Sequence, residues 1–252
     1  MTLTIPMVLI ACVGVFLGSF MDAIAGGGGI ITVPTYLLAG LPMHQALGTN
    51  KLSAAIGTVA SAARFIRSGN VNWPLAAPSV LLALVGSALG TKLQLLVAAE
   101  YLQYMLLAVL PVVAIVVLRQ HEFPEEPGEI APRRQFAIVL SAALVVGAYD
   151  GFYGPGTGTF LLLIFTRWAK MDLRTAAGNV KVVNLASNLG ALFTAILYGQ
   201  AFWTLGLISA VFAFGGHYFG AGLALKNGSK IVRPVVLLVL VLLTLKVCAG
   251  LL

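Results

Sequence analysis

Charged side chains are scarce in this sequence: Lys, Arg, Asp and Glu make up 9% of its 252 residues, whereas 60% are hydrophobic. Soluble domains carry about 25% charged residues. Apolar runs such as 73–89 and 98–118 are close to the ~20 residues that a helix needs to cross a bilayer core. The longest polar stretch is the short segment 119–135, which leaves no room for a separate soluble domain. The sequence therefore predicts an all-α, polytopic membrane protein embedded in the lipid bilayer.

Residues that carry most enzyme and metal chemistry are missing as well. Only two cysteines occur, Cys12 and Cys248, and both lie in apolar segments, which is typical of small packing residues. No cluster of His, Cys, Asp or Glu has metal-ligand spacing, and no GxSxG, HExxH or Walker A motif is present. We therefore expect no metal, no cofactor and no catalytic residue, and an intramembrane enzyme is the least favoured class.

The net charge of +7 has two interpretations. In a soluble protein it would indicate a nucleic acid partner. Here the basic residues lie at the ends of apolar segments, as the positive-inside rule predicts for cytoplasmic loops. We therefore expect no nucleic acid partner and a location in the cytoplasmic (inner) membrane. Ala23-Ile24-Ala25 resembles a signal-peptide cleavage site, but no basic residue precedes the apolar run, so we expect the segment to be retained.

Glycine, in contrast, is abundant, and at two places it interrupts an apolar stretch just after an aspartate, Asp22 or Asp150. Glycine is unfavourable inside a helix because it loses the most backbone freedom on folding. Paired breaks in two halves of a membrane transporter usually mark its substrate site. The break residues that we expect at such a site are Gly26, Gly27, Gly28, Gly29, Gly154, Gly156, Thr157 and Gly158.

The two breaks belong to an internal repeat. A shift of 130 residues places Gly48, Lys51 and Trp73 on Gly178, Lys181 and Trp203. Loop charge also reverses between the halves: the loop at 64–67 is basic, whereas its counterpart near Gly199 has no Lys or Arg. This reversal is expected for inverted repeats under the positive-inside rule. We therefore predict a first membrane repeat at 1–119, a cytoplasmic linker at 120–134 and a second repeat at 135–252, with both termini outside.

Inversion requires an odd number of segments in each half, and five result if each glycine break divides its block into two antiparallel pieces. The expected segments are 6–24, 30–39, 44–65, 73–92, 98–118, 135–149, 157–167, 172–197, 203–225 and 232–249. Ten helical residues rise only ~15 Å. Segments 30–39 and 157–167 are therefore expected to be re-entrant or half-helices that begin inside the membrane, where their free N–H groups favour an anion. Close helix packing is the alternative explanation for the glycines.

Lys51 and Lys181 are expected deep inside apolar helices, where a charge is unfavourable by several kcal/mol. They could bind the anion, pair with Asp22 and Asp150, or extend towards the membrane surface. The two aspartates could cap a helix, pair with a lysine or carry a coupling proton. Asn50, Asn184 and Asn188 lie near the lysines in sequence and either line a polar cavity or join helices by hydrogen bonds. His217 lies in a glycine-containing packing face and is expected to be a hydrogen-bonded core histidine.

The motifs Asp-Ala-Ile-Ala-Gly-Gly-Gly-Gly at 22–29, Ala-Leu-Gly-Thr-Asn-Lys-Leu at 46–52 and Tyr-Asp-Gly-Phe-Tyr-Gly-Pro-Gly-Thr-Gly at 149–158 resemble those of the sulfite exporter TauE/SafE family. The resemblance covers essentially the whole chain and is closest to the YfcA-like branch. It implies a carrier of sulfur-containing anions such as sulfite, sulfonates or thiosulfate. The residues themselves predict a small-anion site between two inverted halves, but they do not predict sulfur.

The leading hypothesis is a secondary transporter that works by alternating access. An anion channel built on the same site, or a carrier of small carboxylates, is the alternative. The direction of transport, the coupling ion, proton coupling and the oligomeric state stay open at this point.

Overall fold

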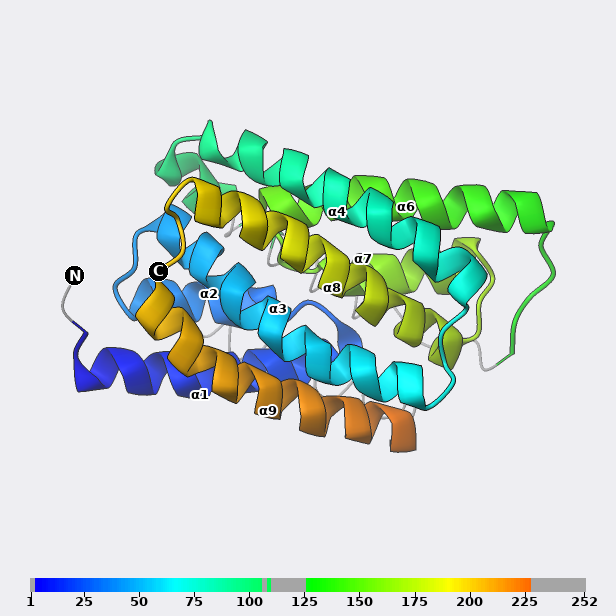
Figure 1. The fold of residues 1–252 in the computed structure, drawn as a ribbon, viewed down its shortest axis with the longest axis horizontal. Coiled ribbons are helices and arrows are strands. Elements are labelled where there is room, and N and C mark those ends of the chain that lie inside the picture. The colour runs from blue at the N-terminus through cyan, green and yellow to red at the C-terminus, as the bar shows by residue number, and fades with distance from the viewer. Residues whose placement is uncertain (1–2, 106–107, 110–125, 228–252) are drawn as a thin grey trace.

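The computed structural model describes residues 3–105, 108–109 and 126–227, and these residues contain helices but no strand. The helices are α1 (Ile5–Ala25), α2 (Gly29–Leu38), α3 (Met43–Arg67), α4 (Trp73–Leu95), α6 (Pro132–Phe152), α7 (Thr157–Leu163), the π-helical turn η1 (Ile164–Trp168), α8 (Leu173–Leu197) and α9 (Trp203–Asn227). Residues 99–105 are helical too. The predicted all-α class is therefore confirmed for the described residues (Figure 1).

Five of these helices, α1, α4, α6, α8 and α9, are long and apolar enough to cross a membrane. The 25-residue helix α3 is equally long but more polar, and it packs against α8 and α9. The predicted segment 232–249, the end of segment 98–118 and the first part of the linker at 120–134 lie outside the described residues. The domain boundaries therefore stay predictions.

The glycine breaks divide their blocks as expected. Helix α1 ends at Ala25 and the short helix α2 begins at Gly29, running back beside α1. In the second half, α6 ends at Phe152 and α7 begins at Thr157. The predicted piece 157–167 is α7 followed by η1, so the helix changes to the wider π-helical pitch before it ends at Trp168. Figure 1 shows both breaks between the two ends of the bundle.

Helices of one half pack on helices of the other. Helix α4 packs along α6, and α9 packs along α1. Each contact depends on glycines spaced four apart, and a Cβ atom on any of them would overlap the backbone of the partner helix: Gly86 and Gly90 against α6, Gly216 and Gly220 against α1. Close backbone approach of this kind is a common basis of helix packing in membranes.

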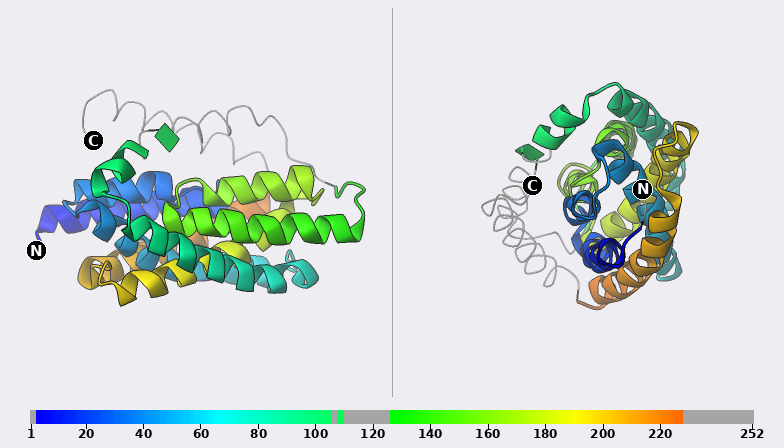
Figure 2. Two further views of the ribbon diagram at one scale, coloured as in Figure 1. Left: turned by 90° about the horizontal axis from the view of Figure 1, so that it is seen from above. Right: turned by 90° about the vertical axis from the view of Figure 1, so that its left-hand side faces the viewer.

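Further contacts recur at positions 130 residues apart. Thr49 Oγ1 accepts a hydrogen bond from the N–H of Phe202 at 3.0 Å, and Asn179 Oδ1 accepts one from the N–H of Asn72 at 2.9 Å. Thr49 of α3 thus binds the loop before α9, and Asn179 of α8 binds the loop before α4. In each case the loop belongs to the opposite half. The corresponding helices α3 and α8 run in opposite directions, as do α4 and α9 (Figure 1). Most helices are nearly parallel to one axis, as the end-on view of Figure 2 shows.

Candidate functional site

The two glycine breaks pack directly against each other. A Cβ atom on Gly26 would lie 2.6 Å from the Cα of Gly158, and one on Gly158 would lie 2.7 Å from the Cα of Gly26. Gly29 faces Pro155 in the same way, with 3.2 Å to its Cα. Gly26 also has a φ of 75°, which residues other than glycine rarely adopt. The glycines therefore pack closely, and this packing brings the starts of α2 and α7 together. Close packing and an anion site between the two helix starts are compatible explanations for these glycines.

Asp22 closes the first break. Its Oδ1 accepts a hydrogen bond from the N–H of Gly28 at 2.9 Å, and its carbonyl accepts one from the N–H of Gly26, also at 2.9 Å. The carboxylate therefore lies at the N-terminus of α2, where the helix dipole favours a negative charge. Capping, one of the roles that the sequence left open for Asp22, is present in the structure.

Each buried lysine pairs with an aspartate of the other half. Lys51 Nζ lies 2.9 Å from Asp150 Oδ1, and Lys181 Nζ lies 3.2 Å from Asp22 Oδ2. Lys181 also donates to the carbonyl of Asp22. Lys51 is 5% exposed and Lys181 is 3% exposed, so neither extends to the membrane surface. A buried charge is tolerated when it is paired and hydrogen-bonded, and both lysines meet this condition.

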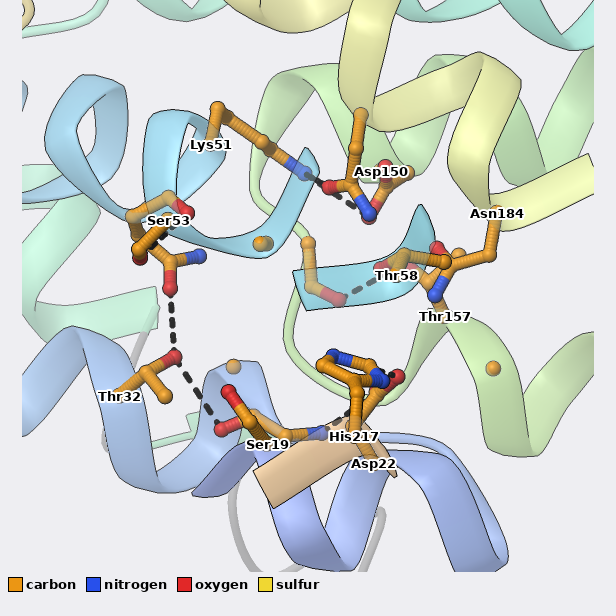
Figure 3. A pocket seen from close by; sticks show the side chains of 17 residues that line it. Ser19, Asp22, Thr32, Lys51, Ser53, Thr58, Asp150, Thr157, Asn184 and His217 are labelled. Atoms are coloured by element: carbon orange, nitrogen blue, oxygen red, sulfur yellow. Dashed lines mark hydrogen bonds and ion pairs between the residues drawn. The ribbon is translucent and has the colours of Figure 1, made fainter. Parts of the chain in front are cut away.

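A polar cavity of about 30 Å³, counted as the space open to the centre of a water-sized sphere, lies beside these pairs (Figure 3). One water needs ~10–15 Å³ by this measure, so the cavity has room for about two waters or a small ion. The predicted site residues that line it are Asp22, Gly28, Gly29, Asn50, Lys51, Asp150, Gly154, Thr157, Gly158, Asn184 and Asn188.

Four predicted site residues do not line this cavity: Gly26, Gly27, Gly156 and Lys181. The three glycines instead form the contact between the breaks. Lys181 is held against Asp22. In this conformation Lys181 does not touch the cavity in which it was predicted to hold an anion, whereas Lys51 does line it.

Several lining residues were not singled out as site residues from the sequence: Ser19, Thr32, Thr58 and His217. Helical spacing could have identified some of them, since Ser19 precedes Asp22 by three residues and Thr58 follows Lys51 by seven. His217 is a hydrogen-bonded core histidine, as expected, because its Nδ1 lies 3.0 Å from Ser61 Oγ. The sequence did not indicate that its ring would also face the cavity.

The cavity wall contains polar groups whose hydrogen bonds are incomplete. Thr58 Oγ1 is buried without a hydrogen-bond partner, and among the described residues the side chains of Ser19 and Asn184 have none either. Asn188 uses only its Oδ1, which accepts from Lys51 at 3.4 Å, and Asn50 uses only its Oδ1, which accepts from Thr32. Buried polar groups are normally paired, and these groups are free to hydrogen-bond to a polar occupant of the cavity, water included.

The charged groups around the cavity are mutually satisfied. Asp150 accepts from Lys51 and, at 2.7 Å, from the hydroxyl of Ser187, while Asp22 accepts from Lys181 and the N–H of Gly28. Residues 3–105, 108–109 and 126–227 contain no group of three or more His, Cys, Asp or Glu side chains that could hold a metal. The site can therefore offer an occupant neutral hydroxyl and amide donors beside two compensated ion pairs.

Comparison with known proteins connects this geometry to a family. Residues 10–247 match the family model described as "Sulfite exporter TauE/SafE". The "probable membrane transporter protein ORF9" of Sinorhizobium sp. is 33% identical over 94% of this chain and 91% of its own length. A "probable membrane transporter protein" of Haemophilus influenzae is 34% identical over 94% and 92%. The "probable membrane transporter protein YfcA" of Escherichia coli is 34% identical over 88% and 82%.

No solved structure matches the chain. The family match extends from α1 past α9 and includes both glycine breaks and both buried lysines. With its all-helical fold, its five membrane-length helices and the paired breaks at its centre, the chain belongs to the sulfite exporter TauE/SafE family of membrane transporters.

Proposed function

We propose that this protein is a secondary transporter that moves a small sulfur-containing anion, such as sulfite, a sulfonate or thiosulfate, across the cytoplasmic membrane. The anion binds in the cavity between the two glycine breaks, and the two halves expose it alternately to either side. The observation that carries this proposal is the set of unpartnered neutral donors on the cavity wall, chiefly Thr58, Asn184 and Ser19.

Neutral donors suit a transported anion because they can hydrogen-bond to it while the two ion pairs beside them keep their own charges balanced. The starts of α2 and α7 contribute Gly29 and Gly158 to the same wall, whereas the N–H of Gly28 already donates to Asp22. N–H groups at helix starts bind anions in many proteins. A site made of such groups binds moderately, which a carrier needs in order to release its substrate on the other side.

The size of the cavity limits the substrate. A volume of about 30 Å³, which is room for about two waters, favours a small oxyanion over a large organic acid in this conformation. The preference for sulfur comes from the family description, because hydroxyl and amide donors would hold a small carboxylate equally well. A carboxylate carrier is therefore the alternative within the same mechanism.

Alternating access is supported by the relation between the halves. The helix pairs α3 and α8, and α4 and α9, run in opposite directions (Figure 1). The ion pairs Lys51–Asp150 and Lys181–Asp22 each join the two halves across the cavity region. Inverted halves held together at a central site can rock about it. This relation also supports the proposed inversion, in which both termini face the outside.

Transport of labelled anions into proteoliposomes tests the proposal. We expect saturable exchange of sulfite, thiosulfate or a short sulfonate, and a large loss of this exchange in Thr58→Val, which removes the unpartnered hydroxyl. Thr194→Val is the matched control, because Thr194 Oγ1 is buried in α8 and donates to the Gly190 carbonyl at 3.1 Å, away from the cavity wall. Equal loss in both variants would contradict the assigned site.

The same preparation separates a carrier from a channel. Single-channel currents far above the turnover of a carrier would favour a channel. Exchange limited to carboxylates would keep the site and exclude the sulfur-containing substrate. Exchange of none of these anions by the unmodified protein would contradict the proposed function.

A further inference from the structure

We infer that His217 binds one proton when the cavity binds its anion, so that anion and proton move together in the same direction. This inference rests on the proposed function and adds its coupling. His217 belongs to α9, is 2% exposed and lines the cavity beside Asp22 (Figure 3).

Hydrogen bonds define which nitrogen of His217 is free. The carbonyl of Thr58, 3.1 Å from Ser61 Oγ, can only accept, so we assign the Ser61 hydroxyl hydrogen to it and assign the 3.0 Å contact to a hydrogen bond that His217 Nδ1 donates to Ser61 Oγ. A neutral imidazole carries one N–H only. The hydrogen therefore lies on Nδ1, and Nε2 is an unprotonated acceptor.

The free nitrogen faces another acceptor across a gap. His217 Nε2 lies 3.9 Å from Asp22 Oδ2, which is longer than a hydrogen bond. Two acceptors that face each other in a buried site leave a place for one hydrogen. A proton on Nε2 would be directed at the carboxylate and would make the pair charge-assisted.

The charged groups around His217 come from several helices. Asp22 on α1 and Lys181 on α8 are the charged groups of the described residues that face it, and Lys51 of α3 lies on the same cavity wall, paired with Asp150 of α6. Arg64 of α3 is directed elsewhere, with its guanidinium 4.4 Å from the ring centroid of Tyr218.

Charge balance supplies the reason for coupling. With His217 neutral, two aspartates and two lysines give the cavity a net formal charge of zero. A monovalent anion would then add one uncompensated negative charge inside the membrane, which is unfavourable. Protonation of Nε2 restores the balance. The step forms one N–H bond from a proton of the water on the open side, and the same bond is broken when the anion is released on the other side.

The two halves differ at this point. The position 130 residues before His217 is Ser87 of α4, whose hydroxyl donates to the carbonyl of Leu84 rather than to Asp150. Asp150 is instead bound by Lys51 and Ser187. Within the described residues, a histidine therefore lies beside Asp22 but not beside Asp150. A single histidine predicts one proton for each anion.

Methanesulfonate is a suitable probe because it stays a monovalent anion over about pH 5–8, the range in which histidine changes charge. In proteoliposomes without a membrane potential, we expect acid outside to drive its accumulation, by about tenfold for one pH unit at one proton per anion. His217→Gln should abolish this accumulation, and the exchange of labelled for unlabelled methanesulfonate at equal pH inside and outside should no longer change with pH in this variant.

His44→Gln is the matched control, because His44 pairs with Gln94 and does not line the cavity. It should keep both activities. Accumulation by His217→Gln equal to that of the unmodified protein would overturn the inference and leave the proposed function intact. Absence of methanesulfonate exchange by the unmodified protein would overturn the inference for this class of anion, and the wider anion panel then decides the proposed function.

A second variant covers the case in which His217→Gln does not fold. Ser61→Ala removes the acceptor that holds Nδ1–H while leaving the imidazole in place. We expect this variant still to accumulate methanesulfonate. The pH at which its rate of uptake is half-maximal should differ from that of the unmodified protein. An unchanged pH profile would contradict the role of the Ser61–His217 contact and with it the proposed proton position.

Discussion

At the scale of single residues, the central feature is that the buried charges cancel in pairs drawn from different halves. Lys51 meets Asp150 and Lys181 meets Asp22, each inside the bundle. A buried ion pair adds little net stability, but removing one partner leaves an uncompensated charge and is strongly destabilising. The pairs therefore join the two halves, and the proposed function assigns the neutral donors around them to the substrate.

The first prediction concerns the Lys51–Asp150 pair. Lys51→Met should lower the free energy of unfolding by about 3–5 kcal/mol, because Asp150 then stays buried without its partner. The double variant Lys51→Met/Asp150→Asn should regain most of this loss, since the second substitution replaces the unpaired carboxylate with a neutral amide. Thermal unfolding in detergent measures both.

Lys92→Met is the control, because Lys92 is exposed near the end of α4 and should change stability little. A double variant that is no more stable than Lys51→Met would contradict the assignment of a compensated pair.

The sequence identified both lysines, both aspartates and three asparagines, because polar residues inside apolar helices are conspicuous. It did not identify which lysine pairs with which aspartate. Each lysine pairs with the aspartate of the other half, and this pairing depends on how the two glycine breaks pack together. Thr58 was missed because threonine is common in membrane helices and usually bonds to its own backbone, as Thr194 does. His217 was interpreted as a core histidine because nothing in the sequence places α9 beside Asp22.

At the scale of elements, the glycine breaks determine where the short helices start. The expected bounds agree closely with those of the described helices, because glycine, proline and loop charges mark the ends clearly. The π-helical turn η1 was not predicted, since no residue in Ile164–Trp168 signals a change of pitch. The sequence predicted close helix packing only as one explanation for the glycines, and it did not predict that Gly26 packs on Gly158.

The second prediction tests this contact. Gly158→Ala should destabilise the protein by about 1–3 kcal/mol, because the added methyl group would lie 2.7 Å from the Cα of Gly26. Gly215→Ala in α9 is the matched control, as its nearest atom, in Phe16, would be 3.7 Å away. That substitution should be neutral or stabilising by up to about 1 kcal/mol. Melting temperatures of the two variants give the comparison, and equal values would contradict tight packing of the breaks.

At the scale of the whole molecule, the reversal of direction between corresponding helices determines the proposed topology. The last turn of α3, just before the loop at 68–72, contains Arg64 and Arg67, whereas the end of α8 and the loop at 198–202 that follows it contain no Lys or Arg. Inverted halves would place these two loops on opposite sides of the membrane. Neither loop charge nor helix direction depends on the identity of the substrate, so topology can be tested separately from function.

The third prediction concerns Ser68 and Tyr198, which are exposed, lie 130 residues apart and follow α3 and α8. In a variant without Cys12 and Cys248, a cysteine in place of Tyr198 should react with a membrane-impermeant thiol reagent added outside intact cells. A cysteine in place of Ser68 should react only in inside-out vesicles. Labelling of both from the same side would exclude inverted halves.

The most direct test of the central claim is the effect of anions on the melting temperature of the detergent-purified protein and its Thr58→Val variant, at matched ionic strength. An anion present at 100 times its dissociation constant should stabilise the folded protein by about 2.7 kcal/mol. We expect sulfite, thiosulfate or a short sulfonate to raise the melting temperature of the unmodified protein, and to raise that of Thr58→Val much less. An equal rise in both proteins would contradict an anion site in this cavity.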